Sequence, residues 1–70
     1  MNMDFREYIK KRRKEEGLTQ KQLAETAGVG LRFIRELEQG KENLRIDKVN
    51  NVLKLFGKKL GAVNLYEEGK

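Results

Sequence analysis

Residues 19–40 read TQKQLAETAGVGLRFIRELEQG, and their apolar spacing predicts two short amphipathic helices joined by a glycine turn. Thr19 is a good N-cap, and Gln22 stands three residues later, where its side chain can reach back to the cap. This pair predicts a capping box that opens a helix at Gln20. The apolar residues of this helix form one narrow stripe: Leu23, Ala24 and Ala27.

The second half of the stretch holds the turn and another helix. Gly28 stands where a helix ends in a left-handed residue, which only glycine adopts without a steric cost. Val29 is expected to fill the corner between the helices, and the second helix begins near Gly30. Gly40 closes this helix, whose inward residues are Ile34 and Leu37.

The outward face of the second helix is charged, and the residues left outside are Leu31, Arg32, Arg35 and Glu36. Charge alone favours a solvated face of a small helical bundle. Arginine, however, also donates two hydrogen bonds to guanine in the major groove and pairs with phosphate. The whole pattern of cap, small residue, glycine, apolar plug and second helix favours a DNA-binding helix-turn-helix.

Apolar spacing predicts further helices on both sides of this stretch. The first runs from about Asp4 to Glu16, with Gly17 ending it and Leu18 entering the core. Its inner face carries Phe5, Tyr8, Ile9 and the stem of Arg12. After the polar loop 41–43, a third apolar pattern stops at Gly57, and its residues are assigned to the core: Ile46, Val49, Val52, Leu53 and Phe56.

The helical pattern breaks in residues 60–66. Their alternation and β-prone side chains predict an extended strand made of Leu60, Ala62, Val63, Asn64, Leu65 and Tyr66. A single strand lacks partners for its backbone hydrogen bonds, and the simplest partner is the same strand of a second copy. The predicted organisation is a helix-turn-helix domain over 1–59, a dimerisation strand over 60–66 and a flexible tail over 67–70.

The composition indicates a polyanion as the partner. The 70 residues include 16 lysines and arginines against 11 acidic residues, for a net charge of +5. Nucleic acid is the favoured partner over an anionic membrane surface, because the core claims the apolar residues of the basic first helix. Cysteine and histidine are absent and the carboxylates do not converge, so we expect no metal, no cofactor and no enzymatic activity. No hydrophobic run approaches a membrane span, and the expected location is the cytoplasm.

Three blocks of sequence carry a family resemblance: GLTQKQLA at 17–24, AGV at 27–29 and IRELEQGK at 34–41. The chain resembles the phage repressor and Cro helix-turn-helix family, and among its members the short HipB-like antitoxins of bacterial toxin–antitoxin operons. The resemblance covers about residues 5 to 66. It implies an all-α, lambda-repressor-like domain of four to five helices, with a C-terminal β-strand that pairs in a homodimer.

The resemblance also assigns roles to positions of this chain. The base-reading positions are Leu31, Arg32, Arg35 and Glu36, and the candidate contacts to the DNA backbone are Thr19, Gln20, Gly30, Phe33, Lys41 and Asn43. Arg13 and Glu38 match an ion pair that ties the first helix to the recognition helix. Glu36 can accept from cytosine or hold Arg32 in place, and Leu31 and Phe33 can each face DNA or pack against the core.

These inferences predict a dimeric, sequence-specific repressor that reads a palindromic operator with two recognition helices about 34 Å apart. The resemblance further implies an antitoxin that represses its own operon and binds a cognate toxin. The alternatives are a phage-type repressor without a toxin, and a protein-interaction module that neutralises a partner.

Overall fold

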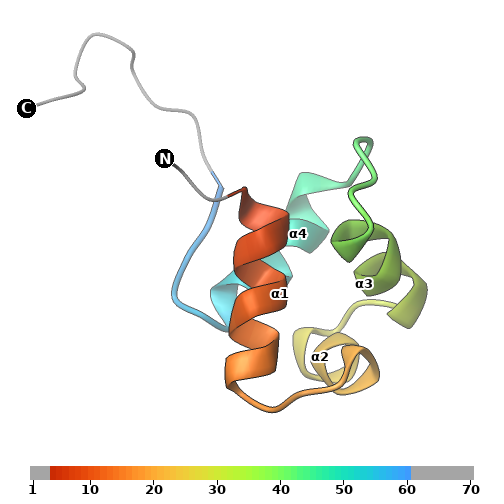
Figure 1. The fold of residues 1–70 in the computed structure, drawn as a ribbon. Coiled ribbons are helices and arrows are strands. Elements are labelled where there is room, and N and C mark those ends of the chain that lie inside the picture. The colour runs from red at the N-terminus through yellow and green to blue at the C-terminus, as the bar shows by residue number, and fades with distance from the viewer. Residues whose placement is uncertain (1–3, 61–70) are drawn as a thin grey trace, which may run out of the picture.

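Four helices make up the regular structure of residues 4–60, the part of the chain that the computed structural model describes (Figure 1). They are α1 (Phe5–Glu15), α2 (Gln20–Ala27), α3 (Leu31–Glu38) and α4 (Ile46–Lys54). Over these residues the all-helical fold class is confirmed. The expectation was four to five helices, and the structure has four there. The predicted strand over 60–66 lies outside the described residues except for Leu60, which is not in a strand.

The ends of α1 and α4 show how local chemistry sets helix length. The Asp4 carboxylate accepts a hydrogen bond from the backbone N–H of Arg6 at 2.8 Å and caps α1. At the other end of the domain, α4 ends at Lys54 rather than at Gly57. The turn that follows brings the Phe56 ring edge-on to Tyr8 of α1, with centroids 6.3 Å apart. An aromatic contact therefore joins α1 to the turn that follows α4.

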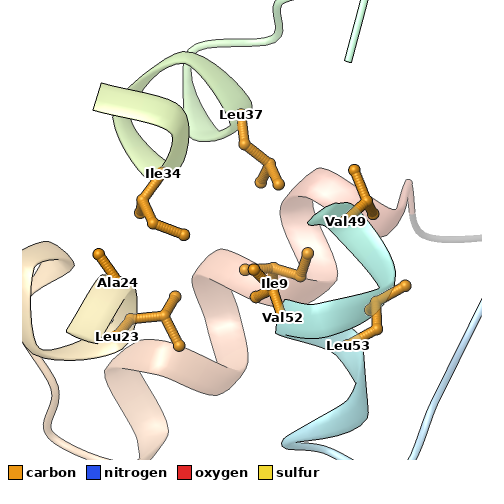
Figure 2. Packing of buried hydrophobic residues seen from close by; sticks show 8 residues of the cluster. All are labelled: Ile9, Leu23, Ala24, Ile34, Leu37, Val49, Val52 and Leu53. Carbon is orange, nitrogen blue, oxygen red and sulfur yellow. The ribbon is translucent and has the colours of Figure 1, made fainter. Parts of the chain in front are cut away.

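Buried apolar side chains from all four helices form one core (Figure 2). Its members are Ile9, Leu23, Ala24, Ile34, Leu37, Val49, Val52 and Leu53. In Figure 2, Ile34 and Leu37 extend from α3 toward the middle of the cluster, where Ile9 of α1 and Val52 of α4 are drawn. Burying each large apolar side chain contributes about 1.5–3 kcal/mol. The core therefore fixes which face of α3 points inward and which remains outside.

The assignment of Ile46 to the core is wrong, because its side chain is 61% exposed. Ile46 is the first residue of α4. A helical side chain leans toward the N-terminus of its helix, and before Ile46 no preceding turn of α4 exists to pack against. Apolar spacing alone cannot separate such a first residue from one in a later turn.

Candidate nucleic-acid interface

α2, the turn and α3 form a unit whose geometry is set by two local devices. Thr19 Oγ1 accepts from the backbone N–H of Gln22 at 3.0 Å, and Gln22 Oε1 accepts from the backbone N–H of Thr19 at 2.8 Å. Gly28 then ends α2 in the left-handed conformation with φ of 73°. Since a side chain would be strained there, glycine is what allows α3 to begin at Leu31 only a short turn later. Figure 1 shows this short turn linking α2 to α3.

α3 divides into a buried face and an exposed face. Ile34 and Leu37 are fully buried, whereas the Arg32 side chain is 90% exposed and Arg35 is also exposed. Arg32 and Arg35 stand three residues apart on one helix, so they share a face. α3 thus presents two exposed guanidinium groups on the side opposite the core.

Leu31 and Phe33 both pack against the core while remaining partly exposed. The Lys48 amine lies 5.9 Å from the centre of the Phe33 ring, which is a cation–π distance. Both residues therefore contribute to packing, and their exposed edges remain candidates for DNA contact.

A charged network on the exposed side of α3 joins Arg32, Glu36 and Lys41, and we call it the Glu36 network. Arg32 Nε donates to Glu36 Oε2 at 3.3 Å, and Lys41 Nζ donates to Glu36 Oε1 at 3.2 Å. The hydrogen bond from Lys41, with a further one from Arg32, holds the pKa of the Glu36 carboxyl below its ordinary value. One carboxylate thus engages a candidate base-reading residue and a candidate backbone contact at once.

A second network joins Arg13, Gln20 and Glu38, and we call it the Glu38 network. Arg13 donates through Nε and Nη2 to the two carboxylate oxygens of Glu38, at 2.7 and 3.0 Å. Gln20 Nε2 donates to Glu38 Oε1 at 3.0 Å, so this candidate phosphate contact is also held against α3. Burial raises the pKa of the Glu38 carboxyl, but the hydrogen bonds from Arg13 and Gln20 outweigh burial and leave that pKa lowered.

The Glu38 network ties α1 and α2 to α3, because its three members come from three different helices. Arg13 also donates through Nη1 to the backbone carbonyl of Leu18 at 2.8 Å, which fixes the loop between α1 and α2. The side chain of Glu38 is only 3% exposed and that of Arg13 is 12% exposed. A bidentate pair with so little exposure orients α3 relative to the rest of the domain.

Arg6 is a residue that the sequence reasoning missed. Its Nε and Nη2 groups donate to the backbone carbonyl of Lys41 at 3.1 and 2.7 Å. The backbone N–H of Lys41 donates in turn to the carbonyl of Glu36 at 3.0 Å. Arg6 therefore anchors the start of α1 to the loop after α3 and fixes the backbone from which the Lys41 side chain extends.

The remaining candidate residues lie at the starts of α2 and α3 and in the loop before α4. Gly30 caps α3 without a side-chain hydrogen bond, Thr19 is engaged in the capping box, and Asn43 is exposed in the loop before α4. Within residues 4–60, no group of three or more acidic, cysteine or histidine side chains could hold a metal ion. None of the helices described here is long and apolar enough to cross a membrane.

Two packed helices joined by a left-handed glycine, with arginines on the outer face of the second, define a helix-turn-helix domain. The chain belongs to the Cro/C1-type helix-turn-helix family, since the family model described as helix-turn-helix matches residues 9–63. The resemblance to phage repressors and Cro is thereby confirmed. This family comprises DNA-binding regulators that are normally not enzymes.

Two known proteins resemble the chain closely. One is an uncharacterised HTH-type transcriptional regulator, y4mF, of Sinorhizobium fredii, 56% identical over 45 residues that cover 64% of this chain. The chain matches 59% of the length of that regulator. The other is a chain of a toxin–antitoxin module from Streptococcus pneumoniae, with a TM-score of 0.74 and 36% identity over 87% of this chain and 67% of the other.

Proposed function

We propose that the protein is a sequence-specific DNA-binding regulator of transcription that places α3 in the major groove. The observation that carries this proposal is the exposed pair Arg32 and Arg35 on a helix whose opposite face is fixed by Ile34 and Leu37. Guanine offers two acceptors in the major groove that suit a guanidinium group. Lys41 and Asn43 in the following loop are the proposed contacts to the sugar-phosphate backbone.

The direct test is fluorescence anisotropy with duplex DNA from upstream of the protein's own gene and with a scrambled duplex, over a series of salt concentrations. Tighter binding to the upstream duplex, with log affinity falling linearly with log salt, supports a specific reader and counts its phosphate contacts from the slope. Equal and weak binding to both duplexes favours the protein-interaction module instead.

Replacing the two exposed arginines tests the proposed base readers. The double variant Arg32→Ala, Arg35→Ala is expected to lose about 1–3 kcal/mol of discrimination for each base contact removed. The matched control is Lys58→Ala with Lys59→Ala, which removes the same charge from exposed positions after α4. Equal losses in the two double variants would mean that the arginines contribute only their positive charge, and would contradict direct reading of the bases.

The proposed regulator acts as a homodimer and represses its own operon. Support for dimerisation comes from the alternating pattern of residues 60–66, and two recognition helices then match successive major grooves of a palindromic operator. Light scattering coupled to gel filtration should give twice the chain mass for the wild type, and a lower mass for Leu65→Asp. A monomeric wild type that still binds the upstream duplex would contradict the dimer while leaving DNA reading intact.

We further propose that the chain is an antitoxin. The support is its similarity to a chain of a toxin–antitoxin module at 36% identity, together with the HipB-like features of its sequence. Co-expression with the product of the neighbouring gene should give a complex that survives purification. Absence of that complex, with operator binding retained, would favour a phage-type repressor that has no toxin.

A further inference from the structure

Glu36 stands in an unusual place for an acidic side chain, on the helix proposed to approach a polyanion. Its two oxygens are used separately, one by Arg32 Nε at 3.3 Å and the other by Lys41 Nζ at 3.2 Å. Among the ion pairs of residues 4–60, these are the two that engage proposed DNA contacts from the exposed side of α3. The Glu36 carboxylate therefore competes with DNA phosphate for both cations.

The geometry of Arg32 determines what Glu36 leaves available. A guanidinium group carries five N–H donors, and the contact with Glu36 uses the Nε donor. Within residues 4–60 the four donors on the two Nη atoms make no hydrogen bond, and the side chain is 90% exposed. An end-on pair of Nη donors suits the two acceptors of guanine, so the ion pair restricts the orientation of Arg32 without blocking base reading.

Lys41 is held on both sides. Its backbone carbonyl accepts from Arg6 and its amine donates to Glu36, which limits how far the amine can move toward a phosphate. On DNA of unrelated sequence, phosphate contacts supply essentially all of the affinity. A cation that must first leave Glu36 contributes less binding free energy at a phosphate than an unpaired cation does. At the operator, base contacts compensate for that loss.

We propose that Glu36 is a specificity-determining residue, which holds Arg32 and Lys41 in internal ion pairs and thereby weakens binding to DNA of unrelated sequence. The inference rests on the proposed DNA-binding function and assigns that function a residue whose role is to suppress non-specific contacts. It differs from reading by Glu36 itself, in which the carboxylate accepts a hydrogen bond from cytosine. The two roles predict opposite effects of neutralising the side chain.

The test is anisotropy with a mixed-sequence duplex and with the upstream duplex, using wild type, Glu36→Gln and the control Glu25→Gln. The control removes one negative charge from an exposed position on α2 that forms no ion pair with any other residue in 4–60. Glu36→Gln should bind the mixed-sequence duplex more tightly than wild type. If two phosphate contacts are released, the ratio of variant to wild-type affinity should fall about 12-fold between about 50 and about 200 mM salt.

A double-mutant comparison shows whether the gain passes through the two cations. Glu36→Gln is combined with Arg32→Ala and Lys41→Ala, and the gain on the mixed-sequence duplex should largely disappear in this background. A gain that persists there, or that Glu25→Gln reproduces, overturns the inference in favour of general charge removal. Circular dichroism at the binding temperature verifies that every variant is folded.

The remaining outcomes separate this inference from the proposed function. If Glu36→Gln weakens binding to the upstream duplex without strengthening the mixed-sequence duplex, Glu36 reads a base and the inference is wrong while DNA reading stands. If the wild type binds neither duplex, the proposed function fails, and the inference falls with it.

Discussion

Glu36 and Glu38 are two carboxylates on the same helix, each bound by an arginine, yet the structure uses them differently. Glu38 is almost completely buried and is bound by Arg13, 25 residues away in the sequence. Glu36 is 29% exposed and is bound by Arg32, one helical turn away. The contact over a long sequence separation fixes the position of α3 in the fold, whereas the local contact only orients side chains on its surface. Burial and sequence separation, more than the chemistry of the pair, decide which role an ion pair has.

The largest effect that this contrast predicts is on stability. Glu38→Ala should lower the free energy of unfolding by about 2–4 kcal/mol, because it leaves the largely buried guanidinium of Arg13 without its partner. Urea denaturation measures the change. A loss below about 1 kcal/mol would mean that water or another group replaces Glu38, and the Glu38 network would not be what orients α3.

The pH dependence of unfolding should follow the same carboxylate. The pKa of Glu38 is lowered in the fold from its ordinary value of 4.5. A lowered folded-state pKa gives stabilisation that is present above the unfolded-state pKa and is lost as pH falls through the folded-state value. We therefore expect wild-type stability to fall as the solution is acidified below pH 4.5.

Glu38→Gln should flatten the acid limb, which is the fall in the free energy of unfolding below pH 4.5. Urea denaturation across the same pH range measures this change. The matched comparison is Glu36→Gln, which removes a carboxyl whose pKa is also lowered but which is more exposed than that of Glu38. Its effect on the acid limb should be smaller, since solvent screens an exposed pair. Equal flattening by the two variants would remove the distinction between the networks.

A smaller effect is expected at Arg6, which connects α1 to the exposed network through Lys41. Arg6→Ala removes two hydrogen bonds to the Lys41 carbonyl and should cost about 1 kcal/mol of unfolding free energy. Lys11→Ala, which removes an exposed lysine from the same helix, serves as the control and should change stability by less than about 0.5 kcal/mol. If both variants behave alike, Arg6 does not anchor the loop.

The smallest effect should come from Glu36→Gln at neutral pH. We expect no measurable change in its urea midpoint, because the Glu36 network is exposed and local and Gln keeps the size of the side chain. A clear loss of stability would mean that Glu36 stabilises the fold as Glu38 does, and would contradict the distinction between the two carboxylates.

The helix-turn-helix unit was predictable because its signals are local. The capping box of Thr19 and Gln22 and the left-handed Gly28 involve contacts within a few residues, and all of them are present in the structure. The core positions of α2 and α3 followed from the same short spacing. Sequence patterns predict such features well because each depends on neighbours along the chain.

What escaped prediction depends on contacts between distant segments. Arg6 reaches Lys41 across 35 residues, and no short-range pattern marks either of them as a partner. Ile46 followed the apolar spacing of α4, but its exposure depends on what precedes the helix in space. The base-reading candidates followed from the outward face of the second helix and from the family resemblance, whereas the backbone contacts followed from the resemblance alone. All of these roles stay predictions until binding is measured.

The short connections between the helices bear on how quickly the domain forms. Residues 16–19, 28–30 and 39–45 join successive helices, so most native contacts form between segments that are already close along the chain. Helical domains of this kind fold in roughly microseconds to milliseconds, since little loop-closure entropy must be overcome. A newly synthesised chain should therefore present a complete α3 surface almost as soon as α4 leaves the ribosome.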